Sequence, residues 1–127
     1  MAKDPIKGNG WAVSSLADLG DGPGFRKVRS ALGVTAFGVN AIVLPPAWVT
    51  PRHRHERQEE LYLVLDGEIE FDLDGATHTV GPGGLVKVDP GTMRSLRNAS
   101  DEAEATYFCV GGAGGYVGRD GIRPDDQ

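Results

Sequence analysis

The stretch that decides the fold runs from His53 to Gly67 and reads HRHERQEELYLVLDG. Its first two histidines are separated by one residue, which on a β-strand directs both imidazoles to the same face. Glu60 follows a short polar stretch and opens the strand-like run from Leu61 to Leu65. If the two segments lie side by side, two imidazoles and one carboxylate converge. Divalent Fe, Mn, Ni and Zn ions accept these ligands, so the stretch predicts a metal pocket.

Two neighbouring carboxylates compete for the third ligand position. Glu60 has the same parity as Tyr62, which is expected to face the interior, whereas Glu59 has the opposite parity. We therefore predict His53, His55 and Glu60 as the metal ligands and keep Glu59 as the alternative.

Composition narrows the class of protein. A chain of 127 residues is expected to form one domain. The net charge of -5 argues against a nucleic-acid partner, because phosphates call for a basic surface. The sequence has no run of about 18 apolar residues and no apolar signal-peptide core, so no membrane span or export is expected. Cys109 is the single cysteine, which excludes an internal disulfide and fits the cytoplasm.

Short strands separated by tight turns fill most of the chain. Asp66-Gly67 and Asp74-Gly75 are strong hairpin signals, and between them apolar and acidic residues alternate from Ile69 to Leu73. Pro45-Pro46 ends the alternating run from Ala36 to Leu44. The other expected strands are Trp48–His55, Ala76–Val80, Leu85–Val88, Met93–Arg97 and Ala105–Val110. This pattern predicts an all-β sandwich or barrel without long helices.

We divide the chain into three parts. Residues 1–24 are expected to form an N-terminal tail and loop, residues 25–110 the barrel, and residues 111–127 a glycine-rich C-terminal tail. A single helical turn is allowed between Ser14 and Leu19. The C-terminal tail is allowed to fold back through Tyr116 and Val117.

The order of turns and ligands resembles the cupin superfamily, in its small single-domain form known as the conserved barrel. The first cupin motif reads G-x5-H-x-H-x(3,4)-E-x6-G. His53, His55, Glu60 and Gly67 fall at those spacings, and Ala47 stands where the motif has its leading glycine.

The second cupin motif reads G-x5-P-x-G-x2-H-x3-N and matches less fully. Gly83, Gly91 and Asn98 fit it, whereas Asp89 replaces the proline and Arg94 replaces the histidine. In the family that histidine is a metal ligand. A guanidinium is always charged and has no lone pair to donate, so Arg94 cannot take over this role.

The resemblance implies a double-stranded β-helix, the cupin or jelly-roll barrel. It implies a divalent transition metal (Fe, Mn, Ni or Zn) on His53, His55 and Glu60, with one ligand fewer than usual. His78 is an alternative fourth ligand, since it shares the parity of Val80, but a lone strand histidine is more often a surface residue. A homodimer is expected, because pairing would cover the exposed edge strands of such a barrel.

Arg94 has several possible roles. If it points inward beside a metal, the excess positive charge calls for an anionic ligand, which a guanidinium can bind. If no metal is present, Arg94 and Glu60 form a buried ion pair. In a third alternative, its long side chain reaches solvent. We predict Arg94 and Tyr62 as substrate-binding residues and assign no catalytic residue, and we interpret Cys109 as an inert thiol.

The preferred functional hypothesis is a metal-dependent enzyme of the dioxygenase or isomerase type that acts on a small anionic molecule. The alternative is a non-catalytic, metal-free module that binds or senses a small molecule. A structural protein with a vestigial pocket is a third possibility. Fold alone does not choose among them, because cupins perform many reactions.

Overall fold

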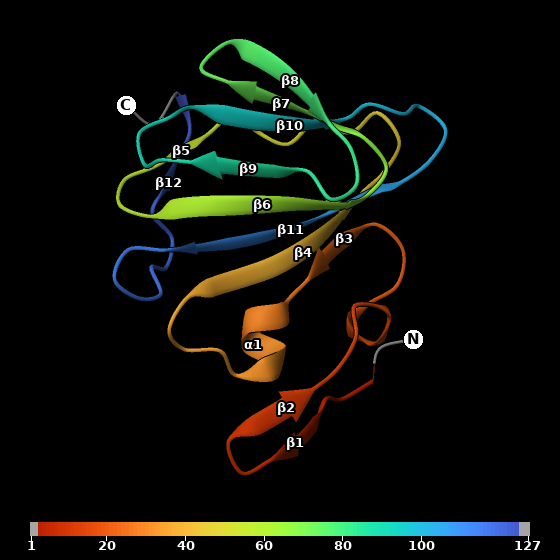
Figure 1. Ribbon diagram of the computed structural model, residues 1–127, viewed down its shortest axis with the longest axis vertical. Coiled ribbons are helices and arrows are strands. Elements are labelled where there is room, and N and C mark those ends of the chain that lie inside the picture. Colours follow the sequence, from red (N-terminus) through yellow and green to blue (C-terminus); the bar gives the residue numbers. More distant parts are fainter. Residues whose placement is uncertain (1–2, 125–127) are drawn as a thin grey trace.

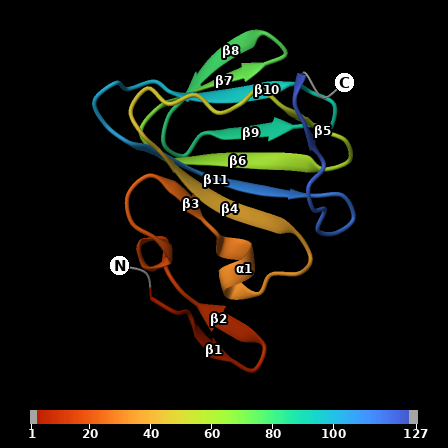
Figure 2. The ribbon, with the colours of Figure 1, turned by 180° about the vertical axis from the view of Figure 1, so that it is seen from behind.

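Two antiparallel sheets form the barrel in the computed structural model, which describes residues 3–124 (Figures 1 and 2). The five-stranded sheet has the order β3-β4-β11-β6-β9 and the three-stranded sheet the order β10-β7-β8. The strands of the larger sheet are β3 (Gly24–Arg26), β4 (Gly38–Leu44), β11 (Ala105–Gly112), β6 (Glu59–Asp66) and β9 (Leu85–Val88). Those of the smaller sheet are β10 (Arg94–Asn98), β7 (Ile69–Leu73) and β8 (Ala76–Val80). The predicted all-β architecture is confirmed.

The core lies between the two sheets and follows the two-residue alternation of their strands. Ile69 and Phe71 of β7 are fully buried and pack with Tyr62 and Val64 of β6. Tyr62 makes edge-to-face contact with Phe71, with the ring centroids 5.4 Å apart. Because Glu60 has the same parity as Tyr62 and Val64, the alternation that builds the core also directs Glu60 into the barrel.

One of the two predicted hairpins forms, at Asp74-Gly75 between the paired strands β7 and β8. The hairpin predicted at Asp66-Gly67 is wrong, because β6 pairs with β9 and β11 whereas β7 pairs with β8 and β10, so the chain turns there from one sheet to the other. Asp74 and Gly75 both have positive φ, 51° and 91°, as a two-residue turn of mirror-image type requires. Gly67 has a φ of 74°, and a Cβ there would lie 2.9 Å from that of Ala105. Gly67 is therefore required both by its backbone conformation and by the close approach of β11.

The N-terminal part contains more structure than the sequence analysis assigned to a tail and loop. Strands β1 (Ile6–Gly8) and β2 (Trp11–Val13) form a hairpin whose turn is Asn9-Gly10, with a φ of 87° at Gly10. A single 3-10 turn, η1 (Ala17–Leu19), lies where one helical turn was allowed. The hairpin is explained by a common Asn-Gly turn signal flanked by Ile6, Trp11 and Val13.

A short helix interrupts the region that we expected to be almost entirely strand. Helix α1 (Val28–Leu32) packs against β4 and ends at Gly33, whose φ of 71° is left-handed and whose N–H donates to the Arg29 carbonyl. Five residues are too few for a helical period to show in the sequence. The glycine at the end of the helix is a common termination signal.

The expected strand from Trp48 to His55 forms only at its end, as β5 (Arg54–His55). Pro51 cannot donate a hydrogen bond, and the ladder before β5 is reduced to isolated bridges. One of these bridges joins His53 to Arg94, and each residue's N–H donates to the other's carbonyl at 3.0 and 2.8 Å. The backbone therefore places His53 directly beside Arg94.

The C-terminal segment crosses back over the barrel, as its apolar residues allowed. Val117 is only 6% exposed, and β12 (Gly121–Ile122) pairs with β5 so that Gly121 lies opposite His55. We call residues 113–122 the C-terminal strap. The views from the front and from behind both place this strap beside β5 (Figures 1 and 2). It therefore covers the segment that carries the histidines.

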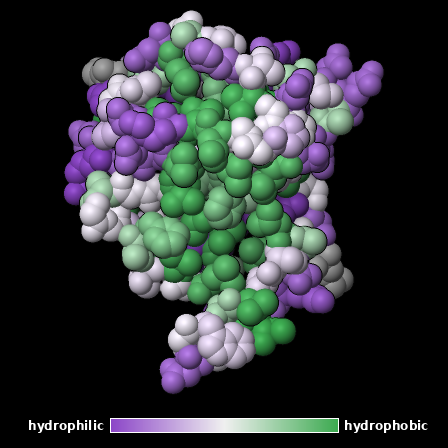
Figure 3. All heavy atoms as spheres, in the orientation of Figure 1, coloured by the Kyte–Doolittle hydropathy of each residue, from purple (hydrophilic) through white to green (hydrophobic). Residues whose placement is uncertain are grey.

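Apolar side chains also lie on the surface of the larger sheet. Leu61 and Leu65 of β6 and Leu85 of β9 are 45%, 41% and 65% exposed. Figure 3 shows apolar residues gathered over the central strands of this view. Such a concentration on a surface is typical of a face that contacts another molecule. Within residues 3–124, no helix is long and apolar enough to cross a membrane.

The buried side chain of Asn98 links separate backbone segments by hydrogen bonds. It is fully buried, and its amide nitrogen lies within hydrogen-bond distance of the carbonyls of Leu44, Pro45 and Ala103, at 3.3, 3.1 and 2.9 Å. Its Oδ1 accepts from the N–H of Ser100 at 3.0 Å. One side chain thus satisfies backbone groups on both sides of the barrel strand that carries it, as buried polar groups require.

Replacing Asn98 with alanine leaves these buried backbone groups without partners. We expect Asn98→Ala to lower the free energy of unfolding by about 2–4 kcal/mol, measured by urea denaturation. The control is Asn40→Ala, since the Asn40 side chain makes no hydrogen bond to residues 3–124, and its effect should stay within about 0.5 kcal/mol. Equal effects of the two variants would contradict this account of Asn98.

Candidate metal centre

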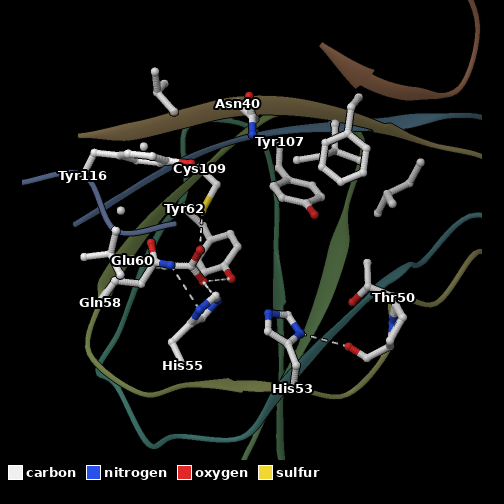
Figure 4. Close-up of a pocket in the computed structure, with 18 of the residues that line it drawn as sticks. Asn40, Thr50, His53, His55, Gln58, Glu60, Tyr62, Tyr107, Cys109 and Tyr116 are labelled. Atoms are coloured by element: carbon white, nitrogen blue, oxygen red, sulfur yellow. Dashed lines mark hydrogen bonds and ion pairs between the residues drawn. The ribbon is translucent and has the colours of Figure 1, made fainter. Parts of the chain in front are cut away.

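The three predicted ligands converge inside the barrel (Figure 4). His53, His55 and Glu60 each offer one ligand atom, and these atoms all lie within 4.8 Å of one another. The histidines come from β5 and the residues before it, and Glu60 comes from the buried face of β6. Two separate segments thus supply the cluster, as the spacing in the sequence indicates.

Hydrogen bonds fix which nitrogen each imidazole presents to the cluster. His53 Nδ1 lies 3.0 Å from the Pro51 carbonyl, and His55 Nδ1 lies 2.7 Å from Asp120 Oδ1. Both partners are acceptors, so Nδ1 donates in each ring and Nε2 is the nitrogen that faces the cluster. His55 Nε2 lies 3.3 Å from Glu60 Oε1. Burial lowers the pKa of His55, but Glu60 and Asp120 outweigh it and raise that pKa, since a protonated ring directs an Nε2–H at Glu60. Once Nε2 is deprotonated, the two imidazoles and the carboxylate are a donor set that fits a divalent metal.

Glu60 is held in its ionised form. Burial favours the neutral acid, but hydrogen bonds from His55 and Tyr62 and the positive charge of Arg94 outweigh it and lower the pKa of Glu60 to about 2. The Tyr62 hydroxyl donates to Oε1 at 2.6 Å, and the Cys109 thiol lies 3.4 Å from Oε2. A carboxylate that stays charged at neutral pH is what a metal ligand requires.

Asp120 orients His55 from the C-terminal strap. Its carboxylate accepts from His55 Nδ1, from the Gln58 side chain, and from the N–H groups of Arg57 and Gln58 at 2.9 and 3.0 Å. Burial raises the pKa of Asp120, but these bonds outweigh it and hold the pKa well below the ordinary value. A carboxylate behind a ligating histidine fixes the ring and increases its basicity.

The sequence analysis did not identify Asp120 or Gln58. Asp120 is 65 residues from His55 and lies in a segment whose glycines indicate a loop, so no local pattern pairs the two. Gln58 lies in the short polar stretch between the histidines and Glu60, yet it is only 8% exposed. The sequence feature that could have identified Gln58 is its uncharged side chain among charged neighbours.

Arg94 points into the barrel and is fully buried. Its Nη1 donates to the Thr92 carbonyl at 2.8 Å, and its Nη2 lies 3.4 Å from Glu60 Oε1. Within residues 3–124, Nε and Nη2 have no hydrogen-bond partner. The alternative in which Arg94 reaches solvent is therefore wrong, because β10 directs it inward with Leu96. Its predicted contact with a substrate stays a prediction.

Tyr62 lines the main cavity with its ring and is 3% exposed. Burial and the nearby charge of Glu60 raise the pKa of its hydroxyl well above the ordinary value, so the group remains a donor. The structure shows this donor directed at Glu60. Its predicted role in substrate binding stays a prediction.

Three alternatives from the sequence lie outside the cluster or are inert. Glu59 is exposed, with a carboxylate oxygen 3.7 Å from Lys87 Nζ, so the structure favours Glu60. His78 is exposed on β8 and does not belong to the cluster. Burial and the charge of Glu60 raise the pKa of the Cys109 thiol far above neutrality, which supports its interpretation as unreactive.

Removing the charge of Asp120 should weaken metal binding without removing a ligand. We expect Asp120→Asn to raise the Kd for Zn(II) or Mn(II) about 10- to 100-fold, because His55 loses its fixed orientation and basicity. Competition with a chromophoric chelator measures the Kd. Asp89→Asn makes the same charge change at an exposed residue beside Lys87 and should leave the Kd unchanged. A Kd that responds equally to both substitutions would show only a general charge effect.

Solved structures share this fold. A cupin-superfamily protein from Silicibacter pomeroyi, described as a sugar phosphate isomerase, is 31% identical with a TM-score of 0.62 and covers 67% of this chain. This chain spans 55% of the length of that protein. A cupin protein from Bacteroides fragilis is 22% identical with a TM-score of 0.70, over 89% of this chain and 96% of its own.

A third structure, oxalate oxidase in complex with glycolate, is 21% identical with a TM-score of 0.56, over 61% of this chain and 42% of its own. No curated protein matches the sequence. The sequence model of the cupin domain matches residues 41–111, which include both motifs and all three candidate ligands. The double-stranded β-helix is thereby confirmed, and the chain belongs to the cupin family.

Proposed function

We propose that this cupin is a metal-dependent enzyme of the isomerase or dioxygenase type that acts on a small anionic molecule. The observation that carries the proposal is the pair of Nε2 atoms of His53 and His55, presented with the ionised carboxylate of Glu60. These three side chains would hold a divalent Fe, Mn, Ni or Zn ion. When bound, such an ion supplies a Lewis acid and, for Fe or Mn, redox chemistry.

The protein's own residues prepare this site in two ways. Asp120 and the Pro51 carbonyl hold protons on the Nδ1 atoms, which leaves Nε2 of each ring facing the cluster. Arg94 adds a fixed positive charge beside Glu60. Together with a divalent ion, this charge exceeds that of the single carboxylate ligand and favours an anionic ligand. The isomerase class is supported by the Silicibacter protein, since it is similar to this chain and is described as an isomerase.

Metal content of the native protein tests the proposal. We expect about one equivalent of a divalent transition metal after purification without chelator, or after reloading, measured by elemental analysis. Glu60→Gln and His53→Ala should each reduce the content well below one equivalent. Glu59→Gln is the matched control, because Glu59 is exposed and outside the cluster. Native protein that takes up no Fe, Mn, Ni or Zn would rule the proposal out.

A second candidate function is a metal-free module that binds or senses a small molecule. The ion pair between Arg94 and Glu60 favours it, because the guanidinium already balances the buried carboxylate. Arg94→His separates the two in the same experiment, since it restores an imidazole at the motif position. Metal in that variant but not in the native protein would favour the binding module.

We also propose that the protein forms a homodimer through the surface of the larger sheet. The exposed side chains of Leu61, Leu65 and Leu85 support this proposal. Leu61→Lys combined with Leu85→Lys should shift the native dimer to monomer in sedimentation-velocity experiments, because each lysine would be desolvated at the interface. Val13→Lys, at an exposed position of the N-terminal hairpin, should leave the dimer intact. A native protein that sediments as a monomer would contradict the proposal.

A further inference from the structure

A cavity of about 560 Å³ opens beside the candidate metal centre. One end is formed by His53, His55 and Glu60, and the other by the inner faces of β4 and β11 (Figure 4). This volume is in the range of small-molecule sites. The metal centre and the cavity therefore form one continuous space.

The far end of the cavity is apolar. Its apolar lining away from the three candidate ligands includes Phe25 of β3, which is also partly open to solvent, Ile42 and Leu44 of β4, and Val117 of the C-terminal strap. Among the described residues that line the cavity, none is a lysine or an arginine. Arg94 is sealed behind the ligands and does not line this space. A second charged group placed against this wall would therefore gain no cationic partner, so the wall disfavours phosphates and second carboxylates.

Asn40, Thr50 and Tyr107 place polar groups in this mostly apolar wall. Tyr107 is 7% exposed, and its hydroxyl makes no hydrogen bond to residues 3–124. Figure 4 shows the hydroxyl directed into the cavity, on the opposite side from His53. Burial raises the pKa of this hydroxyl, so it remains a neutral donor. A hydroxyl that faces the cavity without a protein partner is free to donate to an acceptor on a ligand.

From these features we infer the class of ligand. We propose that the cavity binds an amphipathic monoanion, with one carboxylate at the metal centre, an apolar body against Phe25, Ile42 and Leu44, and an oxygen that accepts from Tyr107. This inference rests on the proposed metal centre and makes it specific. A sugar phosphate is expected to fit this cavity less well, because its doubly charged phosphate and its several hydroxyls need polar partners along the whole molecule.

The test uses metal-loaded native protein and straight-chain carboxylates from acetate to octanoate, with binding measured by isothermal titration calorimetry. We expect the Kd to fall about threefold to fourfold for each added methylene until the apolar end is filled. Glucose 6-phosphate, the polar anion in the comparison, should bind more weakly than octanoate. Octanoate that binds no more tightly than acetate, or no more tightly than glucose 6-phosphate, would overturn the inference.

Two substitutions locate the binding energy. Phe25→Ser should reduce severalfold the gain in affinity that the longer carboxylates show over acetate. Phe37→Ser should not reduce it, because Phe37 is exposed and does not line the cavity. Tyr107→Phe keeps the ring and should weaken binding of all the carboxylates about twofold to tenfold, with the dependence on chain length unchanged. Tyr107→Phe without effect on any member of the series would overturn the role assigned to the hydroxyl.

Metal content is measured on the same samples, which keeps the two proposals separable. If the Kd does not change with carboxylate chain length on fully metal-loaded protein, the proposed ligand class is overturned but the proposed metal centre is not. Failure to load metal overturns the proposed function. A chain-length dependence that persists in such metal-free protein supports the apolar end but overturns the placement of the carboxylate on a metal.

Discussion

The buried carboxylate of Glu60 is the constraint on which the rest of the site depends. A desolvated negative charge is costly unless neighbouring groups compensate it, and here Tyr62, His55 and Arg94 all approach the same carboxylate oxygen, Oε1. Each neighbour has a fixed role because of that charge: the tyrosine donates, the imidazole directs Nε2 at it, and the arginine stays buried. The two functional candidates differ only in which cation provides most of this compensation.

The chain outside the family's motifs completes the site. The cupin match ends at residue 111, whereas the carboxylate that orients His55 belongs to Asp120 of the C-terminal strap. Pairing of β12 with β5 brings the strap into place, and Val117 of the same segment adds to the apolar wall of the cavity. Orientation of the ligands and the shape of the cavity therefore both depend on a segment that carries no cupin signature.

Features with a short sequence period were predictable, and features that depend on distant contacts were not. Parity and the spacing to Gly67 distinguished Glu60 from Glu59, and the dipeptide Asp74-Gly75 placed the hairpin between β7 and β8, because these are properties of neighbouring residues. The dipeptide Asp66-Gly67 marked a turn but not a hairpin, since strand pairing between distant segments puts β6 and β7 in different sheets. Pairing of Asp120 with His55 could not be predicted, since it depends on where a glycine-rich segment crosses the barrel. The hairpin at Asn9-Gly10 differs from both, because its signal was present but was taken for part of a tail. Burial of Arg94 was one of several alternatives, and only the packing of β10 against β7 selected it.

Replacement of the motif histidine by Arg94 changes what that position can do. An imidazole there would donate a lone pair, whereas the guanidinium provides a permanent charge that cannot coordinate. Because Arg94 is fully buried and does not line the cavity, its charge can act on a molecule there through the electrostatic potential without direct contact. A potential selects the sign of a ligand's charge but not its shape. Selection of shape falls to the apolar wall and the Tyr107 hydroxyl, which explains how a site with a buried arginine can favour a single anionic group attached to an apolar body.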